Sequence, residues 1–428
     1  MYNKTDLFRT RKRFLSPSLS LSYKEPLHIV RGRGQYLYDE KGIQYLDAIN
    51  NIQHVGHSHP KIIEAANSQL KKLNTNTRYI DDTILSYAEA LSSRLPDDLN
   101  KFFFTNSGSE SNDLALRLAR NFTNSKETIV LEGAYHGHTS SLIEISPYKH
   151  DGPGGKGAPE YVHSAPMPDP FRGKFKGMGS GPKYANEIKN ILRGLRKANK
   201  QVSAFISEPI MGCAGQLIPP ERFLSMTYDA IRSSNGICIA DEVQVGFGRL
   251  GLSFWGFETQ KVVPDIVSMG KSIGNGHPLS VLATNSEIAE KFDNGMEYFN
   301  SFGGNPVSCA IGHAVLKIIE EEKLQDNARK VGKQLHDMLK DVGSDYDFIG
   351  DIRGMGLFLG IEIVEHSKRL KSSAIIAGKI VEEMKEERVL LSVDGPDNNV
   401  IKIKPPMVFN NRDCQFLIDK LNDVISKY

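Results

Sequence analysis

The sequence predicts an α/β fold whose central sheet is mostly parallel. Short apolar runs typical of buried strands recur at residues 102–105, 128–131, 203–206, 237–240 and 266–268. Helical patterns separate these runs, most clearly at residues 186–200 and 222–233. Strands that alternate with helices are joined by crossovers, which cover both faces of a parallel sheet. At 428 residues, the chain is long enough for a large domain and a smaller one.

A smaller domain is expected after a long helix that begins near residue 305. Its predicted strands and helices lie at residues 350–364, 372–387, 389–393, 400–404 and from 413 onward. A hairpin at residues 35–46, with a polar turn, is expected to join this domain from the other end of the chain. The predicted division is 1–55 for the joining N-terminal segment, 56–310 for the large domain and 311–428 for the small domain.

Composition excludes several classes of function. A net charge of +2, with 24% charged residues, gives no indication of nucleic-acid binding. No apolar run approaches the length of a membrane span. The four cysteines are scattered, which suits a reducing cytosol rather than disulfides or zinc. The basic run at residues 9–13 resembles a mitochondrial transit peptide, but Asp6 counts against it. The predicted location is therefore cytoplasmic, with a mitochondrial address as the alternative.

Lys271 and Asp241 follow two of the predicted strands. Lys271 comes after the run that ends at Met269, and Asp241 ends the run at 237–240. A lysine amine can form an imine with an aldehyde cofactor, and a carboxylate can keep a pyridine nitrogen protonated. A lysine after a strand is more often a solvated loop residue, so this interpretation depends on the neighbouring motifs.

A turn of small residues links the run at 102–105 to a helix that begins near Gly108. Ser107, Gly108 and Ser109 offer backbone amides, hydroxyls and the positive end of a helix dipole, which together favour a phosphate. An ordinary serine or asparagine helix cap is the alternative. Tyr135 follows the strand at 128–131 and could stack on a flat heterocycle or belong to the core. Val243 could close the opposite face of such a ring.

Together these segments resemble the class III aminotransferase family of fold type I pyridoxal-phosphate enzymes. The resemblance covers nearly the whole chain. It implies a seven-stranded-type sheet in the large domain, a smaller α+β domain built from both termini, and pyridoxal 5'-phosphate as cofactor. It makes Lys271 the Schiff-base lysine and Asp241 the partner of the pyridine nitrogen. The further cofactor-binding residues that it implies are Ser107, Gly108, Ser109, Tyr135, His136, Glu208, Val243, Gln244 and Ser301.

Two of these implied residues carry specific expectations. Gln244 is expected to bond the phenolic oxygen of the cofactor. Ser301 stands where the family usually has a threonine that reaches the cofactor phosphate of the neighbouring subunit, and serine keeps the hydroxyl. The expected assembly is therefore a homodimer or a dimer of dimers.

Three histidines, His54, His57 and His59, lie close enough in sequence to be considered as a metal site. No carboxylate or cysteine is placed near them in sequence, so no metal is predicted. They are expected to line or brace the entrance to the active site.

The predicted substrate site lies on the strand at 400–404, before Pro405-Pro406. Lys402 stands where family members that handle amino acids have an arginine, and Lys404 replaces a residue that is usually small or apolar. Both lysines lie on one face of the strand, because side chains alternate. Two ammonium groups suit a dianion such as phosphate. An edge strand protected by lysines is the alternative.

Further segments, at 74–79, 140–148, 274–278 and 389–396, are similar to the ethanolamine-phosphate and phosphohydroxylysine phospho-lyases within this family. The predicted activity is elimination of phosphate from a small phosphorylated amine, such as phosphoethanolamine, to give an aldehyde, ammonia and phosphate. Lys402, Lys404 and Arg78 are the predicted substrate-binding residues. The alternatives are an aminotransferase acting on an ω-amine or amino acid, a phosphohydroxylysine phospho-lyase, and a non-catalytic dimeric interaction module.

Overall fold

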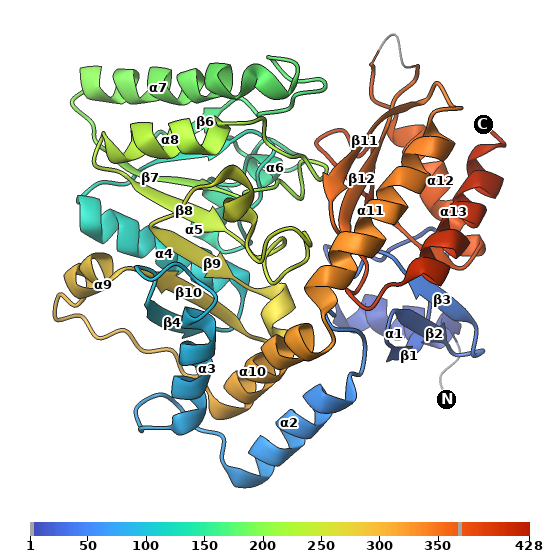
Figure 1. Ribbon diagram of the computed structural model, residues 1–428, viewed down its shortest axis with the longest axis horizontal. Coiled ribbons are helices and arrows are strands. Elements are labelled where there is room, and N and C mark those ends of the chain that lie inside the picture. Colours follow the sequence, from blue (N-terminus) through green and yellow to red (C-terminus); the bar gives the residue numbers. More distant parts are fainter. Residues whose placement is uncertain (1–3, 367–369) are drawn as a thin grey trace.

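A seven-stranded sheet forms the centre of the larger part of the molecule (Figure 1). The computed structural model describes residues 4–366 and 370–428. Along the sheet the strands are β4 (Lys101–Thr105), β10 (Ser280–Thr284), β9 (Ile266–Met269), β8 (Ile237–Asp241), β7 (Val202–Ser207), β5 (Glu127–Leu131) and β6 (Val162–Ala165). Strand β10 is antiparallel to both neighbours, and the strands from β9 to β6 are parallel. The predicted mostly parallel sheet is confirmed.

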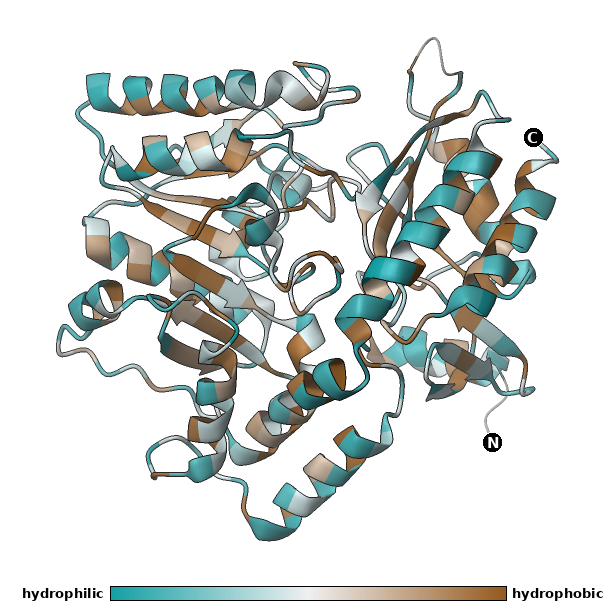
Figure 2. Cartoon of the chain, viewed as in Figure 1, coloured by the Kyte–Doolittle hydropathy of each residue, from teal (hydrophilic) through white to brown (hydrophobic). Residues whose placement is uncertain are grey.

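Helices cover this sheet on both faces because its strands are apolar on both. In β7, Phe205 packs with α7 (Gly181–Lys197) and α8 (Phe223–Arg232), whereas Ile206 packs with α4 (Gly108–Thr123). Neighbouring residues alternate in the same way along β8. Figure 2 shows hydrophobic strands between helices whose outward faces are hydrophilic. This arrangement leaves only the strand ends free to carry polar side chains into a site.

Two strands of this sheet were not predicted from sequence. Strand β6 reads Val-His-Ser-Ala, and its two polar residues interrupt the apolar run that marks a buried strand. Strand β10 is fully buried but directly follows Pro278 and Leu279. Helix α7 begins at Gly181, five residues before its predicted start, with a proline in its first turn.

Two smaller sheets make up the rest of the molecule. One has the order β11 (Ile349–Met355), β12 (Phe358–Ile363), β15 (Val400–Ile403) and β14 (Ser392–Asp394). It lies beside α11 (Leu324–Gly343), α12 (Ala374–Glu386) and α13 (Asn411–Ile425) (Figure 1). The other has the order β1 (Ile29–Arg33), β2 (Tyr36–Asp39), β3 (Gln44–Asp47) and β13 (Val389–Leu390). Because β3 pairs in parallel with β13, the N-terminal hairpin joins the C-terminal part of the chain, as predicted.

One continuous core connects the large and small parts. Buried residues of β9, α10 (Pro306–Glu321) and β15, among them Met269, Val315 and Ile401, belong to a single apolar cluster. The predicted boundary between residues 310 and 311 falls within α10, and the division into domains stays a proposal. The remaining helices are α1 (Lys4–Phe14), α2 (Pro60–Lys72), α3 (Asp82–Ser92), α5 (Ser140–Glu144), α6 (Pro147–His150) and α9 (Ser286–Phe292). Among the described residues, no helix combines the length and apolarity needed to span a bilayer.

Candidate active site

Three parallel strands bring Glu208, Asp241 and Lys271 to one edge of the large sheet. Glu208 directly follows β7, Asp241 ends β8, and Lys271 lies two residues beyond β9. The carboxyl ends of adjacent parallel strands meet at the same edge, which is where ligands bind in open α/β sheets. Lys271 opens a short 3₁₀ turn, η3 (Lys271–Gly274), with a φ of +42°. Such a left-handed backbone is unusual for a lysine and is often found at functional sites.

Asp241 is buried, with 3% of its surface exposed, and accepts hydrogen bonds from three residues. Asn112 Nδ2 and His136 Nδ1 each lie 2.8 Å from Asp241 Oδ2, and Val243 N donates to Oδ1 over 3.2 Å. Since the imidazole nitrogen faces a carboxylate, the Nδ1–H tautomer is the one that fits. Asn112 was not identified from sequence. Its position one helical turn after Ser109, on the same face of α4, could have indicated it.

Gly108 and Gly270 allow the lysine segment, the Asp241 segment and the start of α4 to approach closely. A Cβ on Gly108 would lie 2.9 Å from the Val243 side chain. One on Gly270 would lie 3.2 Å from Val243 and 3.4 Å from the Gly108 backbone. Three segments predicted to contribute to the cofactor site, those of Gly108, Val243 and Lys271, therefore meet in one place.

The turn before α4 combines a helix cap with a free helix N-terminus. Ser107 Oγ accepts a hydrogen bond from Glu110 N over 3.2 Å, so this serine is an N-cap, which was the alternative interpretation. Ser109 Oγ accepts from His138 N over 3.2 Å. Helix α4 has 16 residues, and its first amides and dipole favour an anion at this end.

Gln244 connects this edge of the large sheet to the small domain. Its Nε2 donates to Glu208 Oε1, which also accepts from Gly212 N, each over 3.2 Å. Its Oε1 accepts from Lys404 Nζ and from Asn51 Nδ2, again over 3.2 Å each. Burial and nearby Asp241 raise the pKa of Glu208 to about 7. Asn51, in the loop after β3, was not identified from sequence.

Lys402 and Lys404 share one carboxylate. Lys402 Nζ donates to Asp394 Oδ1 and Lys404 Nζ to Asp394 Oδ2, both over 2.9 Å. Burial would raise the pKa of Asp394, but the two lysines hold it below its usual value. Strand β15 lies between β12 and β14, so the alternative of an edge strand protected by lysines is wrong. The two lysines leave a net positive charge beside Gln244.

The ring of Tyr135 packs edge-on against the ring of Tyr148. Tyr135 is half-buried, and its ring centroid lies 6.3 Å from that of Tyr148, at an interplanar angle of 72°. Burial raises the pKa of Tyr135. Stacking of this ring on a cofactor stays a prediction.

Ser301 and Arg78 lie on a different, exposed surface. Arg78 Nη2 donates to Glu297 Oε1 over 2.9 Å, and its guanidinium lies 4.2 Å from the centre of the Phe299 ring. Ser301 is exposed, and Asn300 next to it donates to Glu110 in the first turn of α4. These contacts bring Arg78 to the loop of Ser301, apart from the partners of Lys402 and Lys404.

Among the described residues, the three clustered histidines share no hydrogen-bond partner, and His54 also bonds Arg249 Nη2 through Nδ1. His54 Nε2 lies 2.7 Å from Phe247 O, His57 Nε2 lies 2.7 Å from Asp47 Oδ2, and His59 Nε2 lies 3.1 Å from Glu322 Oε1. They brace different elements and do not converge. Across residues 4–366 and 370–428, no group of three or more His, Cys, Asp or Glu side chains is arranged to hold a metal ion.

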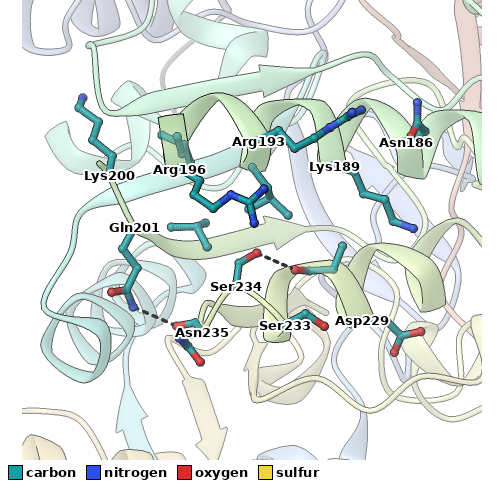
Figure 3. Close-up of a pocket in the computed structure, with 14 residues that line it drawn as sticks. Asn186, Lys189, Arg193, Arg196, Lys200, Gln201, Asp229, Ser233, Ser234 and Asn235 are labelled. Atoms are coloured by element: carbon teal, nitrogen blue, oxygen red, sulfur yellow. Dashed lines mark hydrogen bonds between the residues drawn. The ribbon is translucent and has the colours of Figure 1, made fainter. Parts of the chain in front are cut away.

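A cavity of about 770 Å³ lies away from these residues, between α7 and α8 (Figure 3). Figure 3 shows Arg196 and Lys189 directed into it, whereas Lys200 and Arg193 point away. It contains none of the strand-end residues described above, and its basic side chains do not converge on one point. The strand ends therefore remain the candidate active site.

The family model for class III aminotransferases matches residues 20–425. The chain belongs to this family. It is 47% identical to a Drosophila melanogaster protein named alanine–glyoxylate aminotransferase 2-like, over 97% of this chain and 86% of the relative. It is 39% identical to ethanolamine-phosphate phospho-lyase homolog 1 of Caenorhabditis elegans, over 99% and 94%. The structure of an Arthrobacter phospholyase in complex with phosphoethanolamine matches with a TM-score of 0.94 and 35% identity, over 99% of this chain and 100% of that one.

Members of this family use pyridoxal phosphate, and the strand-end residues fit it. Among the described residues, Asp241 is a buried carboxylate with no lysine or arginine ion-pair partner, as a partner for a protonated ring nitrogen should be. His136 Nε2 and Glu208 Oε2 are buried polar atoms for which the described chain supplies no hydrogen-bond partner. The residues that would hold the cofactor are Lys271, Asp241 and the start of α4.

Asp241→Asn is expected to lower turnover roughly a hundredfold or more, with a much smaller loss of cofactor occupancy. A neutral amide cannot keep a ring nitrogen protonated, although it can still bond Asn112 and His136. Turnover per bound cofactor measures the effect. The matched control is Glu242→Gln, since Glu242 bonds the backbone amides of Gly256 and Phe257 and is expected to affect only stability. Equal turnover of Asp241→Asn and the parent enzyme would contradict the role of Asp241.

Proposed function

We propose that this protein is a pyridoxal-phosphate-dependent phospho-lyase that acts on phosphoethanolamine or a similar small phosphorylated amine. The observation that carries this proposal is the pair Lys402 and Lys404, held together by Asp394 and in contact with Gln244. A net positive charge at this position suits a doubly charged phosphate. The 35% identical phospholyase, whose structure contains phosphoethanolamine, supports the same substrate class.

Three side chains carry out the proposed elimination of phosphate: Lys271, Asp241 and Lys402. When bound, pyridoxal phosphate supplies a sink for the electron pair that remains on the substrate carbon after proton removal. Lys271 Nζ is the proposed base that takes the proton from the carbon bearing the amine. Asp241 keeps the ring nitrogen protonated. Lys402 stabilises the departing phosphate, which takes the electrons of its C–O bond. With addition of one water, phosphoethanolamine gives acetaldehyde, ammonia and phosphate.

An aminotransferase is the second candidate. The Drosophila relative with 47% identity carries an aminotransferase name, and such enzymes would use the same cofactor residues. The two functions differ in the substrate site, where Lys402 stands in place of a forked donor and Lys404 in place of a small or apolar residue. A guanidinium matches a carboxylate in two parallel hydrogen bonds, whereas an ammonium acts as a point charge. The ammonium of Lys402, in a site with a net positive charge, therefore favours the lyase.

The active unit proposed here is at least a homodimer. Exposed apolar side chains gather near Ser301: Ile80 is 99% exposed, Phe302 71% and Tyr79 68%. They adjoin a cleft of about 650 Å³ that Arg78 and the loop before α10 line. Such a surface is typical of a contact with another protein. In a dimer, Ser301 and Arg78 would together reach the site of the neighbouring subunit.

A cytoplasmic location is part of the same proposal. All four cysteines are free, and Cys238, Cys309 and Cys414 are buried, as expected in a reducing compartment.

Lys402→Met should raise the KM for phosphoethanolamine about ten- to a hundredfold, because a lost charge-assisted contact costs roughly 1.5–3 kcal/mol. Release of phosphate and acetaldehyde measures KM, and phosphohydroxylysine is assayed in parallel. The dissociation constant of ethanolamine, read from cofactor absorbance, should not change because that amine lacks the phosphate. Lys427→Met removes an exposed lysine of the same domain and serves as the matched control. Equal weakening of both amines would assign Lys402 to stability, and an unchanged KM would direct attention to Arg78.

Cofactor retention should fall when the enzyme is diluted to monomers, because Ser301 is expected to complete the phosphate site of a neighbouring subunit. Over a dilution series, sedimentation measures the fraction of dimer and absorbance measures the bound cofactor, and the two should fall together. Ser301→Ala should weaken cofactor binding about tenfold, while Ser344→Ala, at the exposed end of α11, should not. A fully loaded, active monomer would exclude this role.

A further inference from the structure

Lys404 differs from Lys402 in what remains available to a ligand. Lys404 is 3% exposed, and its ammonium has three N–H donors. One bonds Asp394 Oδ2 over 2.9 Å and one bonds Gln244 Oε1 over 3.2 Å, while Nζ also lies 5.0 Å from the centre of the Phe358 ring. Two of its three donors are therefore bonded within the protein. The Lys402 side chain is 23% exposed and bonds only Asp394 among the described residues.

The contacts around Gln244 determine which way its amide points. Its Oε1 faces Lys404 Nζ and Asn51 Nδ2, which can only donate. Its Nε2 faces Glu208 Oε1, which already accepts from Gly212 N, so this oxygen is an acceptor whether or not Glu208 carries a proton on Oε2. A reversed amide would set oxygen against oxygen at one end and N–H against donors at the other.

Gly212 makes room for this orientation. A Cβ at residue 212 would lie 2.4 Å from Gln244 Nε2. The charge of Lys271 acts on Glu208, whose Oε1 accepts a hydrogen bond from this Nε2. Lys404 bonds the other end of the amide, at Oε1. The nitrogen end of the amide is thus on the side of Lys271, and its oxygen end is on the side of the small domain.

We propose that Lys404 is a positioning residue that acts through Gln244. Together with Asn51 it fixes the amide so that Gln244 presents its second N–H, the one that does not bond Glu208, rather than its oxygen, to the cofactor beside Lys271. A donor at this point stabilises an ionised cofactor oxygen and lowers the pH at which the bound cofactor titrates. The substrate phosphate is left to Lys402. The role of Lys404 does not depend on whether the enzyme is a lyase or an aminotransferase, whereas the role of Lys402 rests on the proposed function.

Other titratable groups near Gln244 also influence the pH at which the cofactor titrates, and the test has to distinguish their influence from the orientation of the amide. Burial lowers the pKa of Lys404, although Asp394 opposes the shift. Burial raises the pKa of Cys213 to about 12, so this thiol stays neutral near pH 7. The other groups near the amide are Glu208, Asp241, His136, Lys271, Asp394 and Lys402. Loss of a positive charge alone could shift a titration, and Lys402→Met controls for this.

The test is a pH titration of the visible absorbance of the holoenzyme without substrate. Lys404→Met should raise the midpoint on the order of one pH unit, and Lys402→Met should leave it nearly unchanged. Asn51→Ala, which changes no charge, should give a smaller shift in the same direction. In a Gln244→Ala background, Lys404→Met and Asn51→Ala should add no further shift, because residues that act through one partner are not additive.

Circular dichroism and cofactor content show whether Lys404→Met still folds. If it does not, the comparison of Asn51→Ala with the Asn51→Ala, Gln244→Ala double variant tests the proposal instead. An unchanged midpoint in both Lys404→Met and Asn51→Ala would overturn the assignment. So would a shift that persists in full without Gln244. Because this titration contains no substrate, its outcome does not bear on the proposed phosphate elimination, which is tested by phosphate release.

Discussion

The site depends on one constraint, the parallel arrangement of β7, β8 and β9. Parallel strands end at the same edge, so three residues far apart in sequence, Glu208, Asp241 and Lys271, have to meet there. The faces of the sheet are occupied by apolar contacts with α4, α7 and α8. The charged groups of these three strands therefore lie at the strand ends, where low exposure strengthens their interactions.

The small domain contributes charge to this edge. Strand β15 ends at Ile403, and Lys404 continues it to within hydrogen-bonding distance of Gln244. Two lysines near each other inside a protein require a counter-ion, and Asp394 on the neighbouring strand supplies it. The N-terminal segment takes part as well, since Asn51 bonds the same amide oxygen as Lys404. Both ends of the chain thus determine the orientation of Gln244.

Sequence was sufficient where a motif combines a residue type with a strand end or a helix start. Lys271, Asp241 and the Gly108 turn were selected in this way, and the structure brings them to one edge of the sheet; the parallel sheet followed from alternating strands and helices. Asn112, Asn51 and Asp394 were not assigned roles, because an asparagine or aspartate in a helix or loop has no distinctive pattern. Their contacts depend on tertiary packing and on the register of β14 against β15. The pairing of Lys404 with Gln244 spans 160 residues. The same limits apply to β6, whose polar residues conceal a strand.

The central claim, that the protein eliminates phosphate rather than exchanging an amino group, can be tested by counting products per active site. The holoenzyme is mixed with excess phosphoethanolamine and no keto-acid acceptor, while released phosphate and cofactor absorbance are followed together. A phospho-lyase releases many phosphates per site and keeps the aldehyde form of the cofactor. Conversion of the cofactor to its amine form, once per site and without release of phosphate, would contradict the claim and establish an aminotransferase.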